Sequence, residues 1–176
     1  MPRRQAAARD PSQLVDSLSV RQQDLTLLTA LNNSQCQYLV IGGVAVQYFG
    51  CREFSEVNYP DVLIPASEKS AQNIQIALET LNIVSDGART RLLRPGQQLK
   101  LGLPFYAEIL TAGSDLKFEE LYSRSSLAEK NGTTFPIVCF DDLLMMKRKI
   151  VEELRKHERD LECLTQMESL EGGGNR

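Results

Sequence analysis

The feature that most constrains the fold is a short apolar run that stops at two glycines. Residues 38–41 have the sequence Tyr-Leu-Val-Ile, and Gly42 and Gly43 follow them directly. A β-rich apolar run bounded by glycine predicts a buried strand that enters a turn. Residues 44–49 then predict a short helix. A strand–glycine–helix unit of this kind indicates a sheet with helices packed against it.

Further apolar runs predict more strands, and longer amphipathic segments predict helices. We expect strands at 61–64, 91–93, 98–101, 105–110 and 135–140, with Pro95-Gly96 as the turn between the second and third of these. We expect helices at 14–31 (one, or two with a break near Ser19), 67–81 with Ser67 as N-cap, 118–123, 141–154 and 156–170. The predicted class is α/β (α+β): a mixed β-sheet flanked by helices, with an N-terminal helix and a C-terminal helical pair.

The length of 176 residues suits one domain. We expect a disordered tail at 1–11, the domain at 12–170 and a second disordered tail at 171–176. A chain of this size buries about 70% of the surface that its unfolded form exposes, so it needs no disulfide or metal to fold. No apolar run reaches the ~18 residues that a membrane span needs. We therefore expect a cytoplasmic protein without a membrane partner.

Cysteine spacing and net charge exclude two classes of protein. The four cysteines, Cys36, Cys51, Cys139 and Cys163, form no CxxC pair, and His157 is the single histidine, so no structural zinc site is expected. We predict four buried thiols in a reducing compartment. The net charge of −3 and the pI of about 5.3 argue against an extended nucleic-acid-binding surface, but they allow a local pocket for one nucleotide.

Two carboxylates, Asp61 and Glu108, lie within separate predicted strands and have apolar neighbours. A carboxylate in an apolar strand is costly unless it is paired, solvated at a strand end or bound to a metal. Two of them on neighbouring strands would suit Mg²⁺, which takes a few carboxylates together with substrate phosphates. The simpler alternative is that each faces water at an end of the sheet, or pairs with an arginine such as Arg52 or Arg91.

Other candidate residues involve backbone amides and one lysine. Gly42 and Gly43 would let a phosphate approach the backbone at a helix N-terminus, although a Gly-Gly turn is more often a packing feature. Lys147 opens a basic run that predicts a solvated helix face, and one lysine of such a run can contact a phosphate. His157 is predicted to be a surface or inter-helix residue rather than a general base. Without a nucleophile motif, no hydrolytic triad is expected.

Taken together in chain order, the strand–glycine–helix unit, the two carboxylate strands and the later segments resemble the nucleotidyltransferase-like proteins of the DNA polymerase β-type superfamily, in its abortive-infection and toxin-like branch. Residues 38–50 resemble the family's opening strand, Gly-Gly and short helix. Residues 52–64 correspond to its Arg–Thr–Asp-x-Asp stretch, with Asp61 at the second aspartate. Residues 99–111 resemble the strand of the third carboxylate, with Glu108 at that place. Residues 118–122, 135–147 and 155–164 continue the resemblance, which spans 20–167.

The sequence departs from the family pattern at the first aspartate. When the strand is aligned on Asp61, Tyr59 stands at that position, and Asn58 is a shifted alternative. The family's threonine corresponds to Ser55, in a segment slightly longer than usual. Glu108 replaces the commoner aspartate, and its side chain is one methylene longer.

The resemblance implies Mg²⁺-assisted, in-line transfer of a nucleoside monophosphate from an NTP to a hydroxyl acceptor that the sequence does not specify. It assigns metal-binding and catalytic roles to Asp61 and Glu108, and nucleotide binding to Gly42, Gly43 and Lys147. The missing aspartate leaves a second hypothesis of a different class. In it, the chain is a catalytically inactive nucleotidyltransferase-fold protein that acts as a nucleotide-binding or protein-interaction module.

Overall fold

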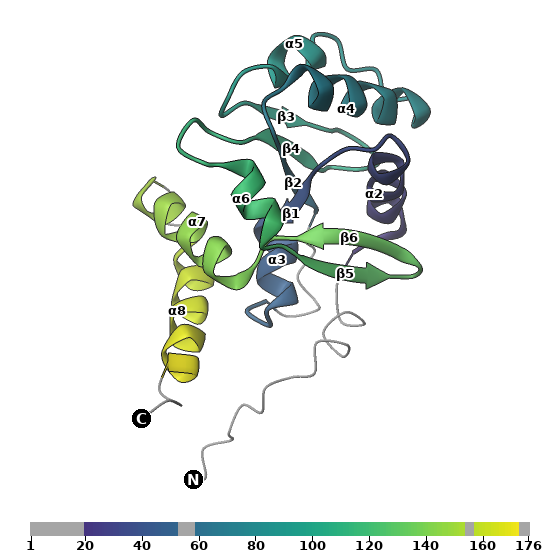
Figure 1. Cartoon of the computed structure of the whole chain (residues 1–176). Coiled ribbons are helices and arrows are strands. Elements are labelled where there is room, and N and C mark those ends of the chain that lie inside the picture. Colours follow the sequence, from purple (N-terminus) through teal and green to yellow (C-terminus); the bar gives the residue numbers. More distant parts are fainter. Residues whose placement is uncertain (1–19, 53–58, 154–156, 173–176) are drawn as a thin grey trace.

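The computed structural model describes residues 20–52, 59–153 and 157–172, and these form an α/β fold with a six-stranded mixed sheet and seven helices (Figure 1). None of the helices in these ranges is long and apolar enough to span a membrane. The elements, labelled as in Figure 1, are α2 (Gln22–Asn33), β1 (Leu39–Ile41), α3 (Gly42–Tyr48), β2 (Asp61–Ile64), α4 (Glu68–Thr80), α5 (Ala88–Leu92), β3 (Gln98–Lys100), β4 (Glu108–Thr111), α6 (Phe118–Ser123), β5 (Ser126–Lys130), β6 (Thr133–Ile137), α7 (Phe140–Glu153) and α8 (Glu158–Gly172).

Some predicted features lie outside the described residues. These are the tail at 1–11, the part of the first predicted helix before residue 20, and positions Ser55 and Asn58. Residues 173–176 of the predicted C-terminal tail also lie outside them. The helix α8 reaches Gly172, two positions into that predicted tail.

The sheet has the strand order β3-β4-β2-β1-β6-β5. The central strand β1 is antiparallel to β2 and parallel to β6, and β2 is parallel to β4. The outer strands β3 and β5 are antiparallel to their neighbours. The predicted mixed sheet flanked by helices is therefore confirmed.

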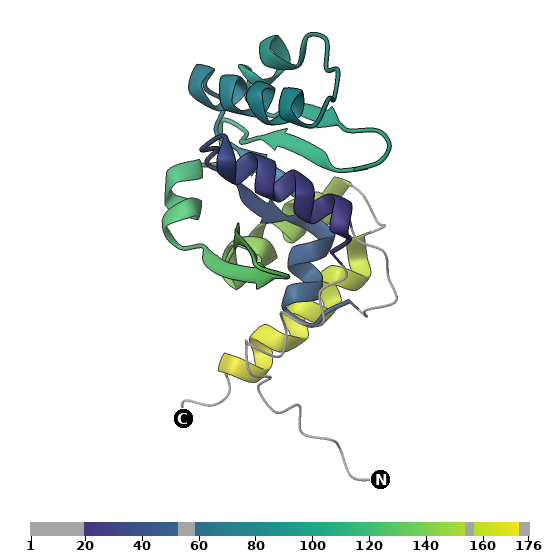
Figure 2. The same cartoon turned by 90° about the vertical axis from the view of Figure 1, so that its right-hand side faces the viewer.

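Helices cover the two faces of this sheet unequally. The helices α2 and α7 lie on opposite sides of the strands (Figures 1 and 2). The helix α2 contacts α4 and β6, and it buries Leu25, Leu28 and Leu31 completely or nearly so. Because side chains alternate along a strand, Asp61 and its buried neighbour Val62 point to opposite faces of the sheet. The face that carries Asp61 is the one on which a cleft opens.

Local signals account for several of the elements. Ser67 caps α4 as predicted, because its hydroxyl accepts a hydrogen bond from the backbone N–H of Ser70 at 3.2 Å. The β5–β6 hairpin was not predicted, although its turn carries a clear signal. Asn131 and Gly132 occupy this turn with φ of 50° and 78°, the two positive values that a type I′ hairpin turn requires. The predicted strand at 135–140 is β6, shifted toward this turn.

The predicted strand at 91–93 is wrong, because these residues belong to α5 and the turn after it. Ala88 and Leu92 are both buried and lie four positions apart, on one face of this short helix. Gly87 precedes it with φ of 72°. The Pro95-Gly96 turn therefore connects a helix, not a strand, to β3.

The predicted strand at 105–110 begins later than expected. Tyr106 has φ of 51°, a left-handed conformation that an extended strand cannot contain. The strand β4 consequently starts at Glu108. This places Glu108 at the first position of its strand, as Asp61 is at the first position of β2.

The prediction of four free thiols is wrong for one pair. Cys51 and Cys163 form a disulfide with a Cα–Cα separation of 5.6 Å, whereas Cys36 and Cys139 are free. The two bonded residues lie 112 positions apart, so only the folded chain brings them together. Spacing along the sequence carries no signal for such a pair, and the cysteines no longer support a reducing compartment.

Candidate functional site

A cleft of about 730 Å³ opens on the sheet face that carries Asp61. Strands β1, β2, β3 and β4 and helices α3 and α7 all contribute residues to its lining. Gly42, Gly43, Asp61, Glu108 and Lys147 all line it. The fold thus brings the five residues singled out from the sequence to one cavity, although they lie on four different elements.

Asp61 and Glu108 are direct neighbours across the parallel β2–β4 pair. Side chains of such register partners point to the same face, and neighbouring strands lie about 4.8 Å apart. Glu108 is 31% exposed; it accepts a hydrogen bond from Gln98 and lies 3.2 Å from the ammonium of Lys100. For Glu108, the ionic partner is thus a lysine on the neighbouring strand β3, and not the arginine considered as one alternative.

Gly42 has a local reason to be glycine. Its φ is +67°, and a Cβ atom at this position would lie 2.1 Å from Oδ2 of Asp61. The backbone needs a residue that accepts left-handed geometry, and the carboxylate needs the space that a side chain would fill. The Asp61 carboxylate consequently lies directly against the start of α3. This close contact explains the glycine at position 42 by packing, which is one of the two interpretations that the sequence left open for the Gly-Gly pair.

Lys147 is buried in a cluster of charges at the cleft wall. Its ammonium lies 2.7 Å from Oδ2 of Asp160, and the two side chains are only 4% and 7% exposed. Arg52 donates to both carboxylate oxygens of Asp160, at 2.9 and 2.7 Å. His157 places Nδ1 3.5 Å from the Lys147 ammonium. Lys147 therefore does not belong to a solvated helix face, as most of its basic run was predicted to.

The pKa of Asp160 follows from these contacts. Burial raises this pKa, but hydrogen bonds from Arg52 and Lys147 outweigh burial and hold it below the usual range of an aspartate. Sequence reasoning missed Asp160, because its partner Arg52 lies 108 positions away. No local pattern marks such a long-range pair.

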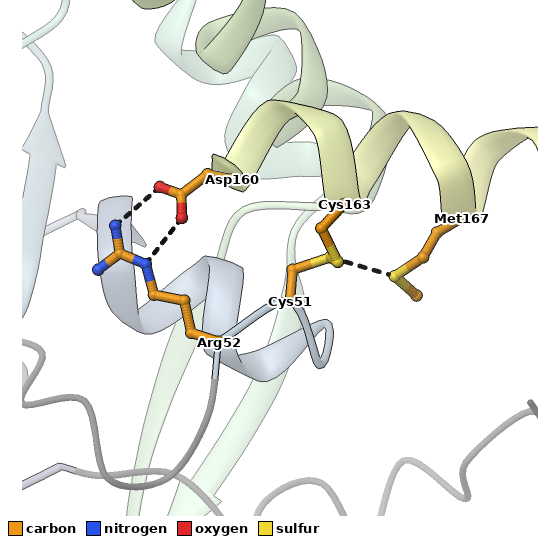
Figure 3. Close-up of a disulfide and its surroundings, with 5 residues drawn as sticks. All are labelled: Cys51, Arg52, Asp160, Cys163 and Met167. Carbon is orange, nitrogen blue, oxygen red and sulfur yellow. Dashed lines mark hydrogen bonds and ion pairs between the residues drawn. A yellow bond between two sulfur atoms is a disulfide. The ribbon is translucent and has the colours of Figure 1, made fainter. Parts of the chain in front are cut away.

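The disulfide lies beside this cluster. Figure 3 shows Cys51 next to Arg52 on the segment after α3, and Cys163 three positions after Asp160 on α8. The sulfur of Cys51 also lies 3.4 Å from that of Met167. A covalent bond and a forked ion pair thus hold the same two segments together at one side of the cleft.

Two tyrosines and an arginine form a group at the acidic end of the cleft. Tyr59 and Tyr106 both line the cleft, and their ring centroids are 5.4 Å apart. The guanidinium of Arg21 lies 4.5 Å from the Tyr59 centroid and 5.9 Å from that of Tyr106. Of these three residues, only Tyr59 was singled out from the sequence, as the residue at the position of the family's first aspartate.

The donor set of the cleft limits which metal it would suit. Within the described ranges, no group of three or more His, Cys, Asp or Glu residues is arranged to hold a metal ion. Asp61 and Glu108 supply two adjacent carboxylates. This set fits Mg²⁺, which proteins bind through one or two carboxylates plus substrate phosphates, and it does not fit a cage built from protein ligands alone.

No family model matches the chain, and no curated protein matches it. The geometry of the cleft is therefore the ground on which a function is proposed.

Proposed function

We propose that the chain has the nucleotidyltransferase fold and that its cleft binds a nucleoside triphosphate with Mg²⁺, transferring the nucleoside monophosphate to a hydroxyl acceptor. One observation carries this proposal: Asp61 and Glu108 are register partners at the first positions of two parallel strands. They face a cleft that also contains Gly42 and Gly43. Two adjacent carboxylates beside a strand–glycine–helix turn are the arrangement that the sequence resemblance implies.

In this proposal Asp61 and Glu108 hold Mg²⁺. Bound there with the nucleotide, Mg²⁺ would offset negative charge on the attacking and leaving oxygens of an in-line displacement. Glu108 can exchange its contact with Lys100 at low cost, because Lys100 is 71% exposed and a surface ion pair is worth about 0–1 kcal/mol. Gly42, which has no side chain, leaves room for the Asp61 carboxylate itself.

The charged cluster favours an anionic ligand at the same cleft. Arg52 and Lys147 place two positive groups at the cleft, and both contact Asp160. Cationic groups in a partly enclosed site attract an anion such as a triphosphate. Lys147 keeps Asp160 as its partner, so we assign it a long-range electrostatic role that needs no direct contact with a phosphate.

A second candidate function is nucleotide binding without turnover, or a protein-interaction role. Tyr59 favours it, because a tyrosine takes the position of the first aspartate and packs against Tyr106. A phenol is not a charged ligand at neutral pH. Asp61 and Glu108 would then bind Mg²⁺ and nucleotide without completing a two-metal arrangement.

The proposal is tested by nucleotide-dependent stability. We would measure urea unfolding with ATP, GTP, CTP and UTP, each with and without Mg²⁺. The proteins are wild type, Asp61→Asn, Glu108→Gln and the control Glu129→Gln, which changes an exposed glutamate on β5, away from the cleft. A ligand at about 100 times its dissociation constant adds about 2.7 kcal/mol to the free energy of unfolding.

We expect Mg²⁺-dependent stabilisation of the wild type and of Glu129→Gln, and its loss in Asp61→Asn and Glu108→Gln. Stabilisation that persists unchanged in both cleft variants, or that does not need Mg²⁺, would contradict the proposed site. Pyrophosphate release in the presence of candidate hydroxyl acceptors separates the two candidate functions. Binding together with release supports transfer, and binding without release supports the second candidate.

A further inference from the structure

Tyr59 and Tyr106 occupy equivalent places relative to the two carboxylates. Each lies two positions before its carboxylate, Asp61 or Glu108. Because β2 and β4 run parallel and in register, the residues that enter them are also neighbours. The backbone N–H of Glu108 donates to the carbonyl of Pro60 at 3.4 Å, so the segments that lead from the two tyrosines into the strands lie side by side.

Both rings leave apolar surface open within the cleft. Tyr59 is 38% exposed and Tyr106 is 44% exposed, and both line the cavity. Their rings are inclined at 45° to one another, so they are not stacked face to face. Open aromatic surface inside a concave site is where a ligand buries its own apolar area.

The backbone at Tyr106 is held in an unfavourable conformation. Its φ of +51° is rare for a bulky side chain, and such conformations cost on the order of 1–3 kcal/mol. They persist where the surrounding structure imposes them, and they cluster at ligand-binding positions. With this backbone conformation, the Tyr106 ring centroid lies 5.4 Å from that of Tyr59.

Arg21 contacts both rings and is itself held by hydrogen bonds. Its guanidinium donates two hydrogen bonds to the fully buried Asp24, at 2.8 and 2.6 Å, and one to the carbonyl of Phe105 at 2.7 Å. The guanidinium is thereby fixed where it lies over the Tyr59 ring. A platform that is already ordered loses little entropy when a ligand binds to it.

We propose that Tyr59 and Tyr106 form a stacking subsite for the nucleobase of the nucleotide held at Asp61 and Glu108. This inference rests on the proposed nucleotide binding and names the part of the nucleotide that the two tyrosines contact. Stacking uses the face of a base, which every base has. We therefore expect ATP, GTP, CTP and UTP all to bind, with the larger purine rings binding more tightly.

The test compares Mg²⁺–ATP with Mg²⁺–tripolyphosphate, a probe that has the phosphates but no base. Affinities are measured by calorimetry for wild type, Tyr106→Phe, Tyr106→Gly and Tyr59→Ala. The glycine variant removes the ring without imposing strain, because glycine accepts positive φ freely, so it keeps the test valid if other variants fold poorly. Leu127→Ala, on exposed β5 away from the cleft, is the control.

We expect Tyr106→Gly and Tyr59→Ala to bind Mg²⁺–ATP about 5- to 150-fold more weakly, the range for loss of one base–aromatic stack. Both should bind Mg²⁺–tripolyphosphate like the wild type, and Tyr106→Phe and Leu127→Ala should bind both ligands normally. Equal wild-type affinity for the two ligands would overturn the stacking subsite and leave the proposed function intact. Equal weakening of both ligands in the tyrosine variants would also overturn it. A wild type that binds neither ligand would overturn the proposed function, and the subsite with it.

Discussion

Breaking the disulfide between Cys51 and Cys163 should lower the stability of the folded chain by a calculable amount. The disulfide closes a loop of 112 residues, for which the chain-entropy relation gives about 16 cal/mol/K, or about 4.8 kcal/mol at 25 °C. This figure is a ceiling, because a compact unfolded chain has less entropy to lose than the relation assumes. The Asp160–Arg52 ion pair joins the same two segments as the disulfide, so we expect breaking the disulfide to act mainly on the unfolded chain.

The assay is urea unfolding of protein purified without reductant. Wild type is compared with Cys51→Ser/Cys163→Ser, and each is measured with and without a phosphine reductant. We expect the double variant to be less stable by between 2 and about 4.8 kcal/mol. Reductant should destabilise the wild type by a similar amount and leave the double variant unchanged, since Cys36 and Cys139 are free in both.

A count of reactive thiols in urea decides whether the premise holds. The unreduced wild type should show two thiols and the reduced protein four, because two of the four cysteines are bonded. Four thiols before reduction would refute the disulfide itself. Two thiols together with an unchanged urea midpoint after reduction would refute the reasoning from chain entropy.

Two more predictions concern the cleft. Asp160→Asn should lower stability by about 3–5 kcal/mol at pH 7, as loss of one partner from a buried ion pair does. The pKa of Asp160 is lowered in the folded state, so the stability that the ionised carboxylate contributes is present above the unfolded pKa and is lost as pH falls below about 4. The urea midpoints of variant and wild type should therefore converge at low pH. A difference between them that stays constant from pH 7 to pH 2.5 would contradict this. Gly42→Ala should abolish stabilisation by Mg²⁺–ATP, because the added methyl group would lie 2.1 Å from the Asp61 carboxylate. Gly102→Ala should keep this stabilisation, because nothing lies within 4 Å of a Cβ atom at that position. Thermal melts of each variant with and without Mg²⁺–ATP measure the stabilisation, and its retention in Gly42→Ala would contradict the geometry.

Elements with strong local signals were predicted from the sequence. The run 38–41 with its glycines, the strand 61–64 and the helix capped by Ser67 each depend on neighbouring residues, and the structure confirms all three. The helix α5 was missed because its five residues are too few to show a period. The turn at Asn131-Gly132 was missed although its dipeptide is the strongest short hairpin signal.

Several residues of the candidate site could be predicted from the sequence, but the contacts between them could not. Asp61 and Glu108 stood out because each is a carboxylate among apolar neighbours, but their register depends on the pairing of β2 with β4. The contacts of Asp160 with Arg52 and of the Tyr59 ring with the Tyr106 ring join distant segments. Nothing in the neighbouring sequence encodes such contacts, because their energy comes from burial in the finished fold.

The parallel pairings also set the order in which the chain can assemble. Val40 of β1 pairs with Ile137 of β6, 97 positions later, and Asp61 pairs with Glu108, 47 positions later. Loops of this length must close before these contacts contribute, and folds dominated by such pairings fold slowly, in milliseconds to seconds. During synthesis, one edge of β1 stays open until β6 leaves the ribosome. For that interval this edge of the central strand is an unpaired template for other chains. The cleft is completed only after the interval, because α7, which lines it, follows β6 in the chain.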